Sequence, residues 1–211
     1  MAPRHAAIAL ATLAMLGVWL ATRSPAPASA RAGGPAACPL PPAVAPGEPP
    51  LQTDVPAGRA PVHRDDALLR PLAGFSVAAR VLGREDYRLG REAEYSPTDL
   101  ALGWGRMADD AVLGQLEIRQ SGRWYRYRWR ERPPIPPAEI VRSSANMHMV
   151  PADDAVAAAL AGLRRDDRVR IDGWLVQVEA GDGWRWRSSL RRDDSGGGAC
   201  ELVYVCAVRR E

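Results

Sequence analysis

The chain has 211 residues and a formal net charge of +3, from 28 basic residues, all of them Arg, against 25 acidic ones. Blocks such as Arg164-Arg165-Asp166-Asp167 cancel their own charge, so this small excess gives little support to a polyanionic partner such as nucleic acid. About 150 residues remain after an export segment and a linker, enough to bury a core without a framework of disulfides, which excludes a small disulfide-stapled scaffold.

The first thirty residues have the order of an export signal. Met1–His5 is basic, Ala6–Ala21 is a stretch of sixteen residues without a charge, and small residues follow at Ala28-Ser29-Ala30. The apolar stretch is shorter than the roughly 20 residues that span a bilayer comfortably. We interpret residues 1–30 as a signal peptide or an N-terminal membrane anchor. Either one predicts an exported, periplasmic envelope protein, tethered to the inner membrane by residues 6–21 if the segment is retained.

A proline-rich segment follows. Ser24–Pro61 holds 11 of the 19 prolines and has almost no periodic apolar pattern. Such a composition favours an extended, semi-rigid linker. We therefore expect a disordered Pro/Ala-rich tether over residues 31–62 and a single globular domain over residues 63–211.

Three elements are predicted in the first half of this domain. Phe75–Val81 alternates as a half-buried strand does, and Asp109–Leu116 reads as a short helix with acidic residues at its start. Arg123–Arg132 alternates between an aromatic side and a basic side, which indicates a strand with Tyr125 and Tyr127 on one face.

The second half of the domain begins with a predicted helix at Ala152–Leu163, after Pro151. A strand follows in which the apolar parity changes at Gly173, and this change predicts a β-bulge there. Gly181-Asp182-Gly183 is typical of a hairpin turn, and Cys200–Val208 is apolar on both faces, as a central strand is. We predict an α+β fold, mainly antiparallel β: a small bent sheet or OB-like (oligonucleotide/oligosaccharide-binding) barrel with two short helices.

Three motifs resemble those of an uncharacterised family of exported or membrane-anchored bacterial proteins. They are Asp99–Gly105 (DLALGWG), Ser144–Pro151 (SANMHMVP) and Trp186–Glu201, which contains WRSSL and GACE. The resemblance covers most of Phe75–Val205. It implies an exported location and a shared fold unit, and it supplies no activity.

Polar residues in two of these motifs are the candidate binding site. The site would combine the segment before the second helix with the polar loop between the last two strands, where an Arg–Asp pair and glycine amides offer donors for an anionic group. The alternative interpretation of the loop is an ion pair that pins a long connection. The candidate ligand-binding residues are Asn146, His148, Ser188, Ser189, Arg192 and Asp194.

A catalytic alternative uses Cys200 as a thiol nucleophile and His148 as its base, with Glu201 or Asp194 as the orienting carboxylate. The Gly-rich approach to Cys200 is similar to that of cysteine peptidoglycan transpeptidases, but a glycine and Glu201 stand where those enzymes carry His and Arg. We therefore favour binding over catalysis.

The remaining chemistry is sparse. Cys200 and Cys206 are six residues apart on one predicted strand, about 20 Å at roughly 3.3 Å per residue, too far to bridge each other, while Cys38 can reach either. No second histidine lies at ligand spacing from His148, so no metal and no cofactor are predicted. The expected partner is a small ligand, a glycan or an envelope protein rather than nucleic acid, and the membrane is expected to be contacted only through the N-terminal segment.

Overall fold

The computed structural model describes residues 38–45, 47–191 and 199–211. Residues 1–37 lie outside this range, and with them the expected export segment and the first part of the expected tether. No helix among the described residues is long and apolar enough to cross a membrane.

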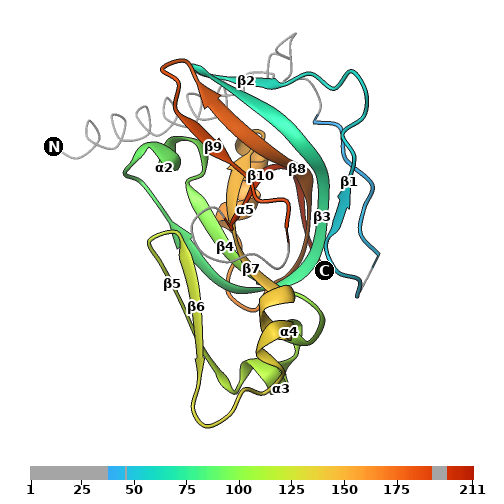
Figure 1. Cartoon of the computed structure of the whole chain (residues 1–211), viewed down its shortest axis with the longest axis vertical. Helices are drawn as coiled ribbons and strands as arrows, with labels where there is room; N and C mark the ends of the chain where they lie inside the picture. Colours follow the sequence, from blue (N-terminus) through green and yellow to red (C-terminus); the bar gives the residue numbers. More distant parts are fainter. Residues whose placement is uncertain (1–37, 46, 192–198) are drawn as a thin grey trace, which may run out of the picture. The chain divides into compact units, whose positions relative to one another are not determined.

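Five strands close into a barrel (Figure 1). Around the ring they are β3 (Ala67–Asp86), β4 (Thr98–Gly103), β7 (Ser144–Pro151), β10 (Glu201–Arg210) and β8 (Arg168–Ala180), which pairs again with β3. All neighbours are antiparallel except β7 and β10, which are parallel. This is the strand order of an OB-like barrel, and the predicted fold class is confirmed.

The long first strand makes closure possible. β3 has 20 residues. It pairs with β8 over Ala67–Arg80 and with β4 over Arg80–Asp86, so one curved strand joins both ends of the ring. A register shift after Pro71 and another after Val81 bend it, as bulges do at barrel corners.

The other elements lie around the barrel. Short strands β1 (Leu51–Thr53) and β2 (Val62–Arg64) pair with β3, and β9 (Arg185–Arg187) pairs with β8. Between β4 and β7 the chain forms a 3₁₀ turn (Gly105–Ala108), α3 (Asp110–Leu113), the hairpin β5 (Leu116–Ser121) and β6 (Trp124–Trp129), and α4 (Pro137–Arg142). α2 (Arg91–Tyr95) precedes β4, and α5 (Asp154–Ala161) joins β7 to β8. The two helices expected from the sequence correspond to α3 and α5.

Alternate residues of the ring strands fill the barrel. Phe75, Leu100, Met147 and Val203 are among the fully buried residues of this core. Val156 and Leu160 of α5 join the same cluster. The Asp153 side chain accepts a hydrogen bond from the Val156 N–H (2.8 Å) and so caps the start of α5.

The bulge predicted at Gly173 is wrong. β8 pairs with β3 without interruption through Gly173, and the extra residue lies on β10, where the register with β8 shifts between Val205 and Ala207. Both faces of β8 are buried, so apolar residues occur at odd and at even positions, and the sequence pattern resembles a change of the buried face. Val169, Ile171 and Leu175 face the barrel core, and Trp174, Val176 and Val178 belong to a second apolar cluster on the outside of the sheet.

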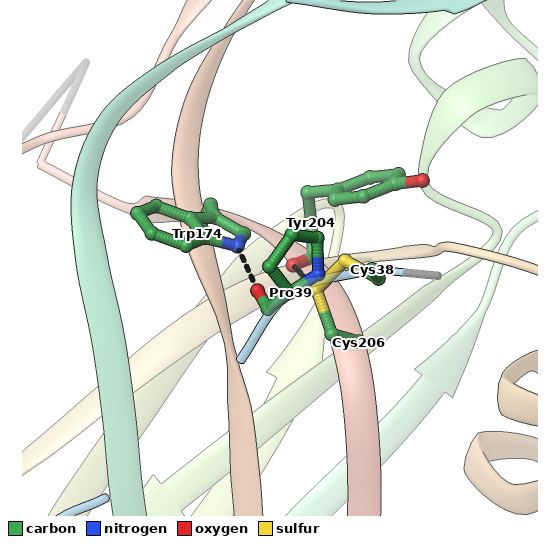
Figure 2. Close-up of a disulfide and its surroundings, with 5 residues drawn as sticks. All are labelled: Cys38, Pro39, Trp174, Tyr204 and Cys206. Atoms are coloured by element: carbon green, nitrogen blue, oxygen red, sulfur yellow. Dashed lines mark hydrogen bonds between the residues drawn. A yellow bond between two sulfur atoms is a disulfide. The ribbon is translucent and has the colours of Figure 1, made fainter. Parts of the chain in front are cut away.

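The described chain from Cys38 onward includes part of the predicted tether. Residues 38–45 and 47–53, here named the strap, lie against the barrel. A disulfide joins Cys38 to Cys206, and the Trp174 indole N–H donates to the Pro39 carbonyl (2.9 Å; Figure 2). Further along, the Val44 N–H donates to Ser76 Oγ (2.8 Å), which donates to Asp172 (2.6 Å). The prolines allow this extended path, and the covalent and hydrogen-bonded contacts fix it to the barrel.

Candidate functional site

The candidate site lies on the outer face of β4 and β7. Leu100 of β4 and Met147 of β7 point into the barrel. The residues next to each of them in the sequence therefore point outward, because side chains alternate along a strand. Asp99, Asn146 and His148 are therefore neighbours on one outer face, with Asp99 directly opposite His148 in the antiparallel register. All three are buried, because other parts of the chain cover them.

Asp99 is the centre of this group. Its Oδ1 accepts a hydrogen bond from Arg123 Nη1 at 2.7 Å, and its Oδ2 accepts one from Asn146 Nδ2 at 3.1 Å. His148 Nδ1 lies 2.9 Å from Oδ1, at ion-pair distance but without the alignment of a hydrogen bond. A fully buried carboxylate needs such partners, because an uncompensated charge is costly to bury.

The β5–β6 hairpin brings Arg123 to this position. Its two turn residues, Gly122 and Arg123, both have positive φ (57° and 69°), as in a tight type I′ turn. The turn is anchored to β7: Asn146 Nδ2 donates to the Arg123 carbonyl (3.1 Å), and Gln120 Nε2 donates to Asn146 Oδ1 (2.7 Å).

The Arg123 guanidinium is held on several sides. It lies over the Tyr87 ring at 3.9 Å and 5.6 Å from the Trp186 ring, and Nη1 also donates to the Ser96 carbonyl (2.9 Å). Burial raises the pKa of Tyr87, whose hydroxyl accepts from the Arg123 backbone N–H (2.8 Å). The Nε and Nη2 atoms of Arg123 make no hydrogen bond to any residue the structure describes, and neither atom is fully buried. The side chain is only 20% exposed and is held by these contacts, so Nε and Nη2 are two fixed donors that keep some contact with solvent.

Aromatic rings continue from this point towards α2. The Trp186 ring lies 4.9 Å from the His148 ring and 6.1 Å from the Trp184 ring, which stacks on Tyr95 at 5.7 Å. Arg91 lies over Trp184 and pairs with Asp182. The hydrogen bond from Arg91 is the main cause that lowers the pKa of Asp182 to about 2, with a further contribution from the Trp184 backbone N–H.

Ser188 and Ser189 border the site. The Ser188 hydroxyl accepts from the Leu202 N–H (3.0 Å), and Leu202 is the parallel-strand neighbour of His148. The Ser189 N–H donates to the Cys200 carbonyl (3.0 Å). Cys200 lies outside the disulfide, and its Sγ is 4.0 Å from the same Arg123 carbonyl that Asn146 contacts. Ser188 and Ser189 thus fasten the start of β10 beside the group.

The sequence predicted only part of this arrangement. It predicted that Asn146 and His148 lie beside the Ser188–Ser189 segment, and in the structure Leu202 connects the two, through its hydrogen bond with Ser188 and its pairing with His148. Arg192 and Asp194 lie outside the described residues. The sequence prediction missed Asp99, Arg123 and Tyr87. Asp99 is in a motif that was noticed, so its polar side chain in an otherwise apolar strand was a usable signal. Arg123 had no such signal, because its position depends on the packing of the hairpin on the barrel.

The chemistry available is hydrogen bonding and stacking around one fixed guanidinium. The described residues include no group of three or more His, Cys, Asp or Glu side chains placed to hold a metal ion.

Comparison of the chain with protein-family models, with curated proteins and with solved structures finds no match.

Proposed function

We propose that this chain is an exported cell-envelope domain that binds a ligand without catalysis, through the outer face of β4 and β7. The observation that carries the proposal is the pair of fixed donors of Arg123, Nε and Nη2. A guanidinium that is fixed by Asp99, the Ser96 carbonyl and the Tyr87 ring loses little entropy on binding, so its two remaining donors are pre-organised.

The position of these donors supports the same function. OB-like barrels bind oligonucleotides or oligosaccharides on their second and third strands, between two flanking loops. In this chain those strands are β4 and β7; Tyr87 lies in the connection between β3 and β4, and Trp186, on β9, lies in the connection between β8 and β10. This part of the argument is an analogy at the level of the fold.

Charge balance favours a glycan over an anionic ligand. Asp99 offsets Arg123, and Asp182 offsets Arg91, so the two cations add no net charge to the face. Nucleic acid binding depends on uncompensated cations that neutralise phosphates. The uncharged oxygen atoms of a sugar suit a compensated guanidinium flanked by aromatic rings. The Cys38–Cys206 disulfide supports an oxidising compartment, as the export segment would require.

The test is isothermal titration calorimetry, in which the full chain is titrated with N-acetylglucosamine tetramer and, separately, with cellotetraose. Arg123→Lys keeps the charge beside Asp99 and removes the two fixed donors, so it should leave the unfolding midpoint near the wild-type value and weaken binding at least about tenfold. Arg142→Lys, on an exposed position of α4, is the matched control. Wild-type affinity in Arg123→Lys, or no binding of either sugar by the wild type, would reject the proposal.

A second candidate function is a cysteine-dependent envelope enzyme that uses Cys200 and His148. The observation that favours it is Asp99, which lies beside His148 Nδ1 as the orienting carboxylate of a Cys–His–Asp set would. Alkylation of Cys200 in the folded chain separates the two functions. Rapid reaction with a thiolate pKa well below that of ordinary cysteine supports the enzyme. Protection until denaturation supports binding.

A further inference from the structure

The net positive charge of the chain is concentrated in one hairpin. Residues 116–132, here named the arm, contain six arginines and two glutamates, a charge of +4, whereas the whole chain carries +3. The rest of the chain therefore sums to −1. A charge asymmetry of this kind points to an interaction surface rather than to a requirement of the fold.

Arg119, Arg126 and Arg128 lie on one exposed face of the arm, whereas Arg123 at the turn pairs with Asp99 of the barrel. The aromatic residues predicted to share a face, together with Ile118, pack against an apolar cluster formed with α3 and α4. The opposite face is exposed, and the arm lies at the periphery of the molecule in Figure 1. The exposed residues on this face, taken along β5 and then β6, are Glu117, Arg119, Ser121, Trp124, Arg126 and Arg128.

Carboxylates of the chain balance only part of this charge. Glu117 pairs with Arg119 and lies 3.5 Å from Arg128. Arg126 lies directly opposite Arg119 in the antiparallel register, and like charges in that arrangement are destabilising. Arg126, Arg130 and Arg132 make no ion pair with any residue in the described ranges. The repulsion between Arg119 and Arg126 lowers the stability of the arm, so the folding of the arm does not explain why both are arginines.

A cleft at the base of the arm adds to this surface. Its volume is about 810 Å³, within the range of pockets that hold small groups. Arg128, Arg130 and Arg132 line it together with Trp129, Glu117 and Glu131. Three guanidinium groups at alternate positions beside one cleft suit a phosphate group, which accepts several such donors at once.

We propose that the arm docks on an anionic phospholipid surface, with the guanidinium groups on lipid phosphates and Trp124 at the lipid–water interface. Trp124 is 38% exposed and stands beside the arginines at the tip of the arm, and an exposed indole flanked by arginines is typical of membrane interfaces. Nucleic acid fits less well, because the other aromatic rings of the arm face inward and cannot stack on bases. A chain that residues 1–30 anchor to the inner membrane, as the sequence predicts for a retained segment, would work beside a bilayer. Trp124 follows Arg123 in the chain, but the Arg123 side chain pairs with Asp99 of the barrel, whereas Trp124 lies on the exposed face of the arm.

The test is co-sedimentation of the full chain with vesicles of phosphatidylglycerol and phosphatidylcholine, or of phosphatidylcholine alone. Arg126→Gln/Arg130→Gln removes two arginines that have no ion pair in the described chain. Arg88→Gln/Arg165→Gln removes two exposed arginines elsewhere and is the control of equal charge. The N-terminal segment is the same in all three proteins, so any insertion by that segment cancels in the comparison.

We expect the arm variant to bind anionic vesicles about tenfold more weakly than the control, and we expect 0.5 M salt, on the order of that needed to screen exposed charges, to remove the difference. Trp124→Ala should weaken the binding that remains at high salt. Equal binding by the arm variant and the control, or equal binding of the wild type to neutral vesicles, would overturn the proposal. Binding to soluble polygalacturonate that depends on Arg126 and Arg130, without binding to vesicles, would assign the surface to an acidic glycan instead.

Discussion

Asp99 on β4 and Arg123 at the tip of the arm, 24 residues apart in sequence, form a buried ion pair of 2.7 Å. This pair joins the barrel to the hairpin that covers it. It also orients the guanidinium whose Nε and Nη2 are the proposed ligand contact. One interaction therefore connects the stability of the domain to its proposed function.

Substitution of Asp99 should be strongly destabilising. Asp99→Asn removes the charge that compensates Arg123 and leaves a buried guanidinium without its carboxylate. Loss of one partner of a buried pair costs about 3–5 kcal/mol, and we expect a decrease in the free energy of unfolding in urea near the lower end of this range, because Arg123 keeps some exposure.

Asp54→Asn, at an exposed carboxylate, should change the free energy of unfolding by less than about 0.5 kcal/mol and serves as the control. A double-mutant cycle with Arg123→Gln should give a coupling energy above about 1 kcal/mol. Additive effects of the two substitutions would show that the pair does not join the arm to the barrel.

Gly173 should not tolerate a side chain, for a reason that the sequence did not suggest. A Cβ at this position would overlap the Tyr204 carbonyl oxygen, where β10 comes close at its register shift. Gly173→Ala should therefore lower the free energy of unfolding by about 1–3 kcal/mol. Gly181→Ala has its nearest obstacle at 3.5 Å and should have a much smaller effect. Equal thermal shifts in the two variants would contradict this explanation.

The comparison of sequence and structure is clearest for strands with one buried face. The alternation around Phe75 predicted a half-buried strand, because burial of one face imposes a period of two on the residues. Cys200–Val208 has no such alternation, and its apolar residues on both faces predicted a central strand. β8 misled the same reasoning, because its outer face is also covered and both parities are apolar.

The strap and the site depend on contacts that a local pattern does not contain. The strap is proline-rich, as an extended linker is. The Cys38–Cys206 bond and the Trp174–Pro39 contact join residues more than 130 positions apart. The candidate site became partly visible because Asn146 and His148 are polar residues of a conspicuous motif; the sequence placed them in a segment before a helix, and the structure places them on β7. Arg123 remained hidden, since the turn that carries it has no feature that indicates where the hairpin packs.

The Arg91–Asp182 pair should be lost only in strong acid. The folded pKa of Asp182, about 2, lies below the unfolded value of 3.8, so its contribution to stability is fully present above pH 3.8 and is lost as the pH falls through about 2. A carbon-detected NMR titration of the Asp182 carboxyl should give a midpoint near 2 in the wild type. In Arg91→Gln, which removes the main cause, the midpoint should rise towards 3.8. A wild-type midpoint already near 3.8 would show that the pair does not form in solution.

The disulfide should stabilise the whole domain through the strap. It joins residues 168 positions apart, so it restricts the unfolded chain strongly, and bonds of this kind typically contribute about 2–4 kcal/mol. Cys206→Ser should lower the free energy of unfolding by this amount and should increase cleavage of the strap by proteases, because Pro39 and Val44 would then be held by hydrogen bonds alone. Cys200→Ser keeps the disulfide and should leave the strap protected, which separates loss of the bond from loss of a thiol. Peptide mapping of the unreduced protein should recover Cys38 linked to Cys206, and recovery of Cys38 linked to Cys200 would refute the pairing and this role of the strap.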